Sequence, residues 1–268
     1  MIITYPDTKF NLSIELINLS RLNLIILSDR LKLMIKPPFI DKEIYHIYNR
    51  GVEKRIIFND DRDRFRFIHS LFQFNDTNPT PTNNCYYYSR SPEYNEYNEV
   101  EPHYTREPRK PIVDILAFCL MPNHFHLMLR QKQKNGIVNF MKKLGTGYTM
   151  YFNKKHERVG PLFQGRFKAV HVGSDEYFRY LCHYIHLNPL DMNTPEWREG
   201  KIKNFNSAID YIENYRWSSL QDYSNIKNFP SVISKNLISE VFNNRYKQDL
   251  QAWIKDFNLE PVRDLLLE

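Results

Sequence analysis

Two histidines lie one residue apart in the segment His124-Phe125-His126. Side chains alternate between the two faces of a β-strand, so we expect both histidines on one face and Phe125 on the other. Two imidazoles placed in this way can bind one divalent cation. The pair alone is a weak signal, because nine histidines in 268 residues would give about 0.3 such pairs by chance. Two exposed strand histidines are the alternative interpretation.

A phenol and an amide are spaced one helical turn apart further along the chain. Tyr184 and Asn188 differ by four positions, which places them only about 40° apart around a helix. The amide oxygen could complete a metal site, and the phenol could act as a nucleophile. Tyr177 and Tyr180 lie along the same side. The alternative is therefore a row of tyrosines that pack on a half-buried helix with their hydroxyl groups in water.

The segment from residue 130 to residue 172 is strongly basic. It holds ten Lys and Arg residues against one acidic residue, so its net charge of +9 exceeds the +6 of the whole chain. A solvated helix face usually mixes both signs, whereas here aromatic residues separate the basic ones. We therefore expect binding to nucleic acid, and to single strands in particular. The candidate DNA-binding residues are Arg130, Lys142, Lys143, Lys154, Lys155, Arg158, Arg166 and Lys168.

The elements that must position these residues follow from hydrophobic periodicity and from the helix-capping and turn residues. Ser174 is a good N-cap for a helix that ends at the Asn188-Pro189 step, where the proline stops it. The predicted order is strand, helix, strand, strand, helix, strand, helix, over residues 43–51, 60–74, 112–120, 124–130, 135–153, 166–172 and 174–188. Without the last helix this order predicts an α+β fold, a split-βαβ (ferredoxin-like) antiparallel sheet with helices on one face.

Three other segments do not fit this repeat. Residues 1–39 follow neither helical nor strand periodicity, and we interpret them as an uncertain N-terminal extension. Residues 75–110 contain almost no aliphatic side chains and several prolines, which is typical of an insertion or flexible loop. Residues 218–268 are expected to form a helical C-terminal appendage, with one amphipathic helix over about 235–257. The central domain is then 40–217.

Composition excludes several classes of protein. A hydrophobic fraction of 42% with 18 Phe and 18 Tyr is enough to build a core, which excludes a wholly disordered chain. We expect no membrane association, because no stretch approaches the ~20 apolar residues of a spanning helix. The three cysteines lie far apart, which argues against a disulfide framework and favours a cytoplasmic location.

Four segments resemble the single-tyrosine HUH transposases of the insertion-sequence-200-like superfamily, and are closest to its repeat-associated tyrosine transposases. They are YHIYNRG (45–51), MPNHFHLML (121–129), YTMYFNKKHERVGPLFQGRFKA (148–169) and YLCHYIHLNP (180–189). The resemblance covers residues 40–217, with four motifs in the family's order. The 75–110 insertion and the first 33 residues do not match the family pattern.

The resemblance implies a homodimer that acts on single-stranded DNA with hairpin or repeat ends and needs Mg²⁺ or Mn²⁺. It places the metal ligands at His124, His126 and Asn188, and the nucleophile at Tyr184. Tyr148 and Tyr151 lie in another of the motifs and are rival nucleophiles. The predicted function is a transposase that cleaves and rejoins DNA through a covalent 5′-phosphotyrosine. The alternatives are a domesticated HUH endonuclease and a non-catalytic single-stranded nucleic-acid binding module on the same fold.

Overall fold

A computed structural model describes residues 37–78 and 109–255. The chain divides into two compact units, Met1–Pro38 and Phe39–Glu268, and nearly all the described residues belong to the second. The expected N-terminal extension and most of the expected 75–110 insertion lie outside the described residues, so both stay predictions. No helix in the described part is long and apolar enough to cross a membrane.

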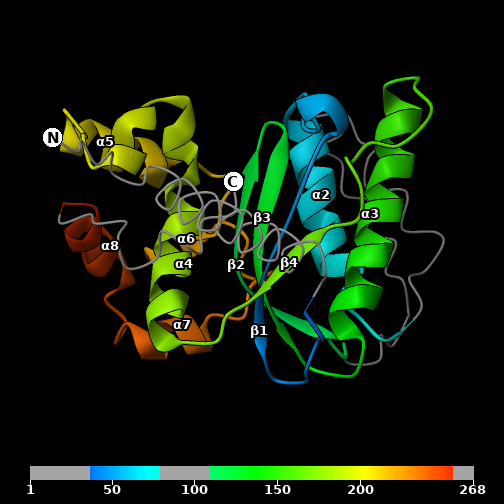
Figure 1. Cartoon of the computed structure of the whole chain (residues 1–268), viewed down its shortest axis with the longest axis horizontal. Coiled ribbons are helices and arrows are strands. Elements are labelled where there is room, and N and C mark those ends of the chain that lie inside the picture. The colour runs from blue at the N-terminus through cyan, green and yellow to red at the C-terminus, as the bar shows by residue number, and fades with distance from the viewer. Residues whose placement is uncertain (1–36, 79–108, 256–268) are drawn as a thin grey trace, which may run out of the picture. The chain divides into compact units, whose positions relative to one another are not determined.

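The centre of the second unit is a four-stranded sheet (Figure 1). Its strands are β1 (Ile44–Arg50), β2 (Val113–Met121), β3 (His124–Gln131) and β4 (Lys168–His171). Their order in the sheet is β2-β3-β1-β4, and every neighbouring pair is antiparallel. This confirms the predicted α+β class and split-βαβ strand order.

Two helices of this split unit, α2 (Asp61–Gln73) and α3 (Gly136–Lys155), lie together on one face of the sheet (Figure 1). The Asp60 side chain begins α2 by accepting a hydrogen bond from the backbone N–H of Asp63, as expected of an N-cap. Phe67 of α2 packs against Phe125 of β3, with ring centroids 4.9 Å apart. Phe125 therefore points toward α2, and the prediction that it lies on the face of β3 opposite the two histidines is correct.

The opposite face of the sheet is covered by α4 (Asp175–Leu187) and by the helices that follow it (Figure 1). Ser174 caps α4 as expected, accepting a hydrogen bond from the Tyr177 N–H. All nine residues of β2 are buried, as required of a strand covered on both faces. The expected placement of helices on one face thus holds for α2 and α3, and α4 completes the other layer. The other helices and 3-10 turns of the described residues are η1 (Val52–Lys54), η3 (Asn188–Met192), η4 (Pro195–Glu199), α5 (Phe205–Asn214), α6 (Leu220–Tyr223), α7 (Asn236–Val241) and α8 (Tyr246–Lys255).

The C-terminal helices are an integral part of the core. The Ser219 hydroxyl accepts a hydrogen bond from the Phe118 N–H in β2 at 2.9 Å, and Tyr246 is only 2% exposed. The single helix expected over 235–257 is two helices, α7 and α8. Asn243 and Asn244 separate them with left-handed φ angles of 49° and 57°, a conformation that asparagine tolerates and a helix does not.

Candidate active site

The two histidines of β3 face α4. Strand register pairs His126 with Tyr48 and His124 with Arg50, and directly opposed residues of an antiparallel pair share a face. The His124 and His126 rings are 5.1 Å apart and nearly perpendicular. His126 is fully buried, while His124 is partly buried. The alternation expected from the sequence therefore brings both imidazoles to one surface, together with an aromatic and a basic side chain from β1.

A third histidine, His46 of β1, contacts His126. Its Nε2 lies 2.9 Å from Nδ1 of His126, so one of these nitrogens carries the shared proton. If His126 is to offer Nε2 to a metal, its Nδ1–H must donate to His46, which fixes the tautomer of both rings. Burial lowers the pKa of His46 to about 3. Burial, followed by the charges of His124, His46, Arg198 and Arg50, lowers the pKa of His126 well below its ordinary value, so both imidazoles are neutral at pH 7.

Tyr184 of α4 lies directly against these histidines. Its ring centroid is 5.6 Å from that of His126 and 6.2 Å from that of His46. Tyr180, one turn earlier, stacks on Tyr184 at 5.7 Å. The predicted row of tyrosines along one side of α4 therefore exists, and Tyr184 is the member in contact with His126.

The rival tyrosines of α3 lie on the other side of the sheet, and their hydroxyl groups are engaged there. The Tyr148 hydroxyl donates to the Ile57 carbonyl at 2.5 Å, and burial raises its pKa well above the ordinary value. The Tyr151 hydroxyl donates to Asp63 at 3.1 Å. This arrangement favours Tyr184 over both as the nucleophile.

Asn188 ends α4 with its side chain fully buried. Its Nδ2 donates to the Tyr184 backbone carbonyl at 2.8 Å. Because a carbonyl can only accept, the amide nitrogen must face it, and Oδ1 points elsewhere. That oxygen is buried and has no hydrogen-bond partner among the described residues. Buried acceptors are normally satisfied, so the amide oxygen fits the expected role of a metal ligand.

The donor set of two imidazoles and one amide oxygen suits a divalent cation that keeps part of its water shell. Within residues 37–78 and 109–255, no cluster of three His, Cys, Asp or Glu side chains could hold a metal ion by itself. The third member of the predicted set, Asn188, is an amide and stands outside these four residue types.

Arg198 is a residue of the site that sequence reasoning missed. Its guanidinium carbon lies 5.2 Å from the Tyr184 ring centroid, and Asp191 holds it through two hydrogen bonds of 2.9 and 2.6 Å. Burial alone would lower the pKa of Arg198, but hydrogen bonds to Asp191 and to the Tyr184 side chain outweigh it and raise that pKa. The turns η3 and η4 after the Asn188-Pro189 step bring Arg198 back over the helix, and no local sequence pattern indicates this return.

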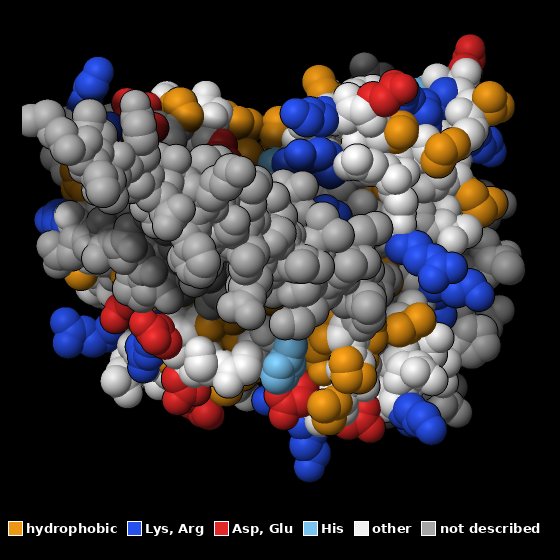
Figure 2. Space-filling view, in the orientation of Figure 1, with side chains coloured by type: hydrophobic (Ala, Val, Ile, Leu, Met, Phe, Trp, Pro, Cys, Tyr) orange, Lys and Arg blue, Asp and Glu red, His pale blue; other side chains and the backbone are white. Residues whose placement is uncertain are grey.

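The basic residues expected to bind DNA fall into two groups. Arg130 forms a two-pronged hydrogen bond with Asp114, and Lys155 bridges Asp60 and Asp63 at 2.7 Å, so both have structural partners. Lys143 donates to the Asp76 carbonyl, and Arg158 to Asn153 and the Pro161 carbonyl. The four others, which form no ion pair within the described part of the chain, are Lys142, Lys154, Arg166 and Lys168. In Figure 2 several Lys and Arg side chains are visible on the side of the molecule that carries α2 and α3, interspersed with side chains of other kinds.

Residues 98–188 match the family model described as "Transposase IS200 like", about one third of the sequence. That segment includes His124, His126, Tyr184 and Asn188, and over these residues the match agrees with the family predicted from the motifs. None of the curated proteins is significantly similar.

One similar solved structure is described as "Structure of the REP associates tyrosine transposase bound to a REP hairpin". It has 11% sequence identity and a TM-score of 0.44, and the match covers 76% of this chain and 92% of that chain.

Proposed function

Because residues 98–188 belong to the IS200-like transposases, we propose that this transposase cuts and rejoins single-stranded DNA through Tyr184. The observation that carries the proposal is the position of the Tyr184 ring, 5.6 Å from His126 and beneath the guanidinium of Arg198. A phenol beside a positive charge and two candidate metal ligands is suited to nucleophilic attack.

In the proposed reaction the Tyr184 oxygen attacks the phosphorus of a phosphodiester. The new bond joins that oxygen to the 5′-phosphate of the downstream strand, and the bond from phosphorus to the 3′-oxygen breaks. The phenolic proton is lost, and the departing oxygen takes up a proton to become a free 3′-hydroxyl. A second 3′-hydroxyl can reverse the step and join strands, because the phosphotyrosine retains the energy of the cleaved bond.

The residues around Tyr184 would each contribute to this step. Arg198 would stabilise the phenolate, and it would also attract the phosphate. His46 would hold His126 in one tautomer and orientation. His124, His126 and Asn188 would hold Mg²⁺ or Mn²⁺, which supplies Lewis-acid polarisation of the scissile phosphate.

The substrate class follows from charge and from the family. We propose single-stranded DNA with hairpin or repeat ends, bound mainly by the candidate basic side chains for which the described residues provide neither an ion pair nor a side-chain hydrogen bond, with the protein acting as a homodimer. Lys142, Lys154, Arg166 and Lys168 are the favoured phosphate contacts, whereas the ion pairs of Arg130 and Lys155 favour a structural role.

The test is cleavage of a labelled single-stranded hairpin with Mn²⁺ by wild type, Tyr184→Phe and Tyr180→Phe. Each variant loses one oxygen and keeps its ring in the stack. We expect Tyr184→Phe to be inactive and Tyr180→Phe to retain cleavage. Binding without cleavage by the wild type would instead indicate a non-catalytic binding module.

A further inference from the structure

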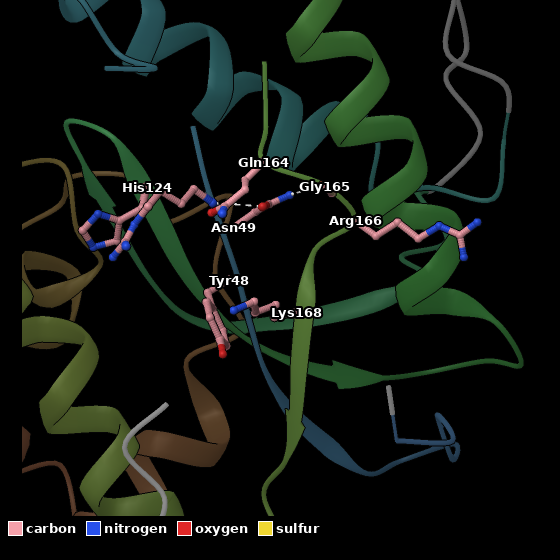
Figure 3. A pocket seen from close by; sticks show the side chains of 8 residues that line it. Tyr48, Asn49, His124, Gln164, Gly165, Arg166 and Lys168 are labelled. Carbon is pink, nitrogen blue, oxygen red and sulfur yellow. Dashed lines mark hydrogen bonds between the residues drawn. The ribbon is translucent and has the colours of Figure 1, made fainter. Parts of the chain in front are cut away.

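A polar pocket opens beside His124, between the end of β1 and the segment that precedes β4 (Figure 3). Its volume is about 230 Å³, below the ~300–1,000 Å³ typical of sites for drug-sized ligands. The pocket can therefore accept one small group, such as a single nucleobase. The side chains that matter for recognition are Tyr48, Arg50, Gln164 and Lys168.

Two hydrogen bonds, one between backbone groups and one from a side chain, hold the wall of the pocket. The Gln164 N–H donates to the Arg50 carbonyl at 2.9 Å, and Asn49 Nδ2 donates to the Gly165 carbonyl at 3.1 Å. The loop is thereby fastened to Asn49 and Arg50 at the end of β1. A site fixed before the ligand arrives loses less conformational freedom on binding.

The charge of the pocket selects an anion. No carboxylate lines it, and neither Arg50 nor Lys168 forms an ion pair with any acidic residue that the structure describes. The Lys168 ammonium lies 5.8 Å from the centroid of the Tyr48 ring. The Arg166 guanidinium, in contrast, points away from the other labelled side chains (Figure 3).

The same pocket offers groups that recognise a base. The Tyr48 ring is half-buried and stacks on His46 at 5.0 Å, which fixes its plane. Such rings support bases of single strands by stacking. The side-chain amide of Gln164 makes no hydrogen bond to the described residues. Such an amide can both donate a hydrogen bond to a base edge and accept one from it.

We propose that this pocket holds the base of one unstacked nucleotide of the single strand, next to the phosphate that Tyr184 attacks. The base lies against Tyr48, Gln164 contacts its edge, and Arg50 and Lys168 neutralise its phosphate. The inference rests on the proposed function, because His124 is both a wall of the pocket and a proposed metal ligand. A free mononucleotide has the same chemistry, and the experiment separates the two sources.

The experiment scans single abasic sites along a single-stranded substrate and measures affinity by fluorescence anisotropy in EDTA, so that cleavage does not intervene. For the wild type we expect one position, adjacent to the cleavage site, where loss of the base weakens binding by about five- to a hundredfold. In Tyr48→Leu and in the exposed variant Gln164→Ala this penalty should shrink at that position alone. Val159→Ala is the matched control, because Val159 lies in the same connection between α3 and β4, is 91% exposed and does not line the pocket, so its loss should leave the position dependence intact.

A flat abasic scan, or a penalty unchanged in both Tyr48→Leu and Gln164→Ala, would overturn the pocket assignment while the wild type still binds and cuts DNA. Saturable binding of a free mononucleotide combined with a flat scan would overturn the assignment to a strand. Absence of any single-strand binding would refute the proposed function and this inference together.

Discussion

Replacing Arg198 by methionine tests whether its charge activates Tyr184. A unit charge 5.2 Å from the ring centroid interacts with a phenolate by about 3 kcal/mol at an effective dielectric constant of 20. The Arg198 side chain is 31% exposed, and solvent screening reduces this to about 1–3 kcal/mol. We therefore expect the single-turnover cleavage rate near neutral pH to fall by about 5- to 150-fold.

The pH profile separates activation from simple structural support. The positive guanidinium favours the phenolate, so removing it should slow cleavage most at pH values where the phenol is protonated. The difference in cleavage rate between the wild type and Arg198→Met should therefore narrow as pH rises toward the ordinary phenol pKa of about 10. Arg198→Lys keeps the charge and should recover part of the rate. Arg179→Met is the matched control, because Arg179 also lies over an aromatic ring, Phe242, at 4.9 Å. A deficit that is constant across pH, or equal to that of Arg179→Met, would refute the reasoning.

Three further predictions follow from the metal ligands, the basic surface and a buried histidine. His124→Ala and His126→Ala should abolish Mn²⁺-dependent cleavage in a gel assay and keep DNA affinity, whereas His171→Ala, on the exposed edge strand β4, should cleave normally; cleavage by the double alanine variant would exclude the metal site. Affinity for single-stranded DNA should fall steeply with salt as counterions are released, and an affinity independent of salt in anisotropy titrations would contradict the electrostatic interpretation. Burial lowers the pKa of His186 to about 3, so below about pH 6.5 the unfolded chain takes up a proton at this residue that the folded chain does not. This group should therefore lower the unfolding free energy by ~1.4 kcal/mol per pH unit as pH drops toward 3. Urea titrations at several pH values should show that the unfolding free energy of His186→Gln falls less steeply with decreasing pH than that of the wild type.

Local patterns in the sequence were sufficient for most of the framework. Alternation in β3 predicted the shared face of His124 and His126, and the Ser174 cap with the Asn188-Pro189 stop predicted α4. Both depend on interactions within a few residues, which a short segment carries in full. The continuous burial of β2 was readable as an apolar run, but which elements cover its second face is set by contacts distant in sequence.

The rest of the site depends on the register between strands and on turns that bring distant residues back to α4. Local periodicity determines neither of these. His46 meets His126 only because β1 pairs with β3 in one particular register, although its segment was recognised as a motif. Arg198 reaches Tyr184 through two short turns and an ion pair to Asp191. Likewise, the charge count over residues 130–172 could not separate Lys155, paired with carboxylates, from Lys168 in the pocket.

The most direct test of the central claim is to locate the covalent DNA adduct. Wild-type protein is incubated with a single-stranded hairpin and Mn²⁺, denatured, digested with trypsin and sequenced by tandem mass spectrometry. Tyr184 falls in the peptide spanning 180–198, while Tyr148 and Tyr151 fall together in the peptide spanning 144–154. The proposed mechanism predicts a phosphodeoxynucleotide on Tyr184. An adduct on residues 144–154 would contradict it, because that helix lies across the sheet from His126.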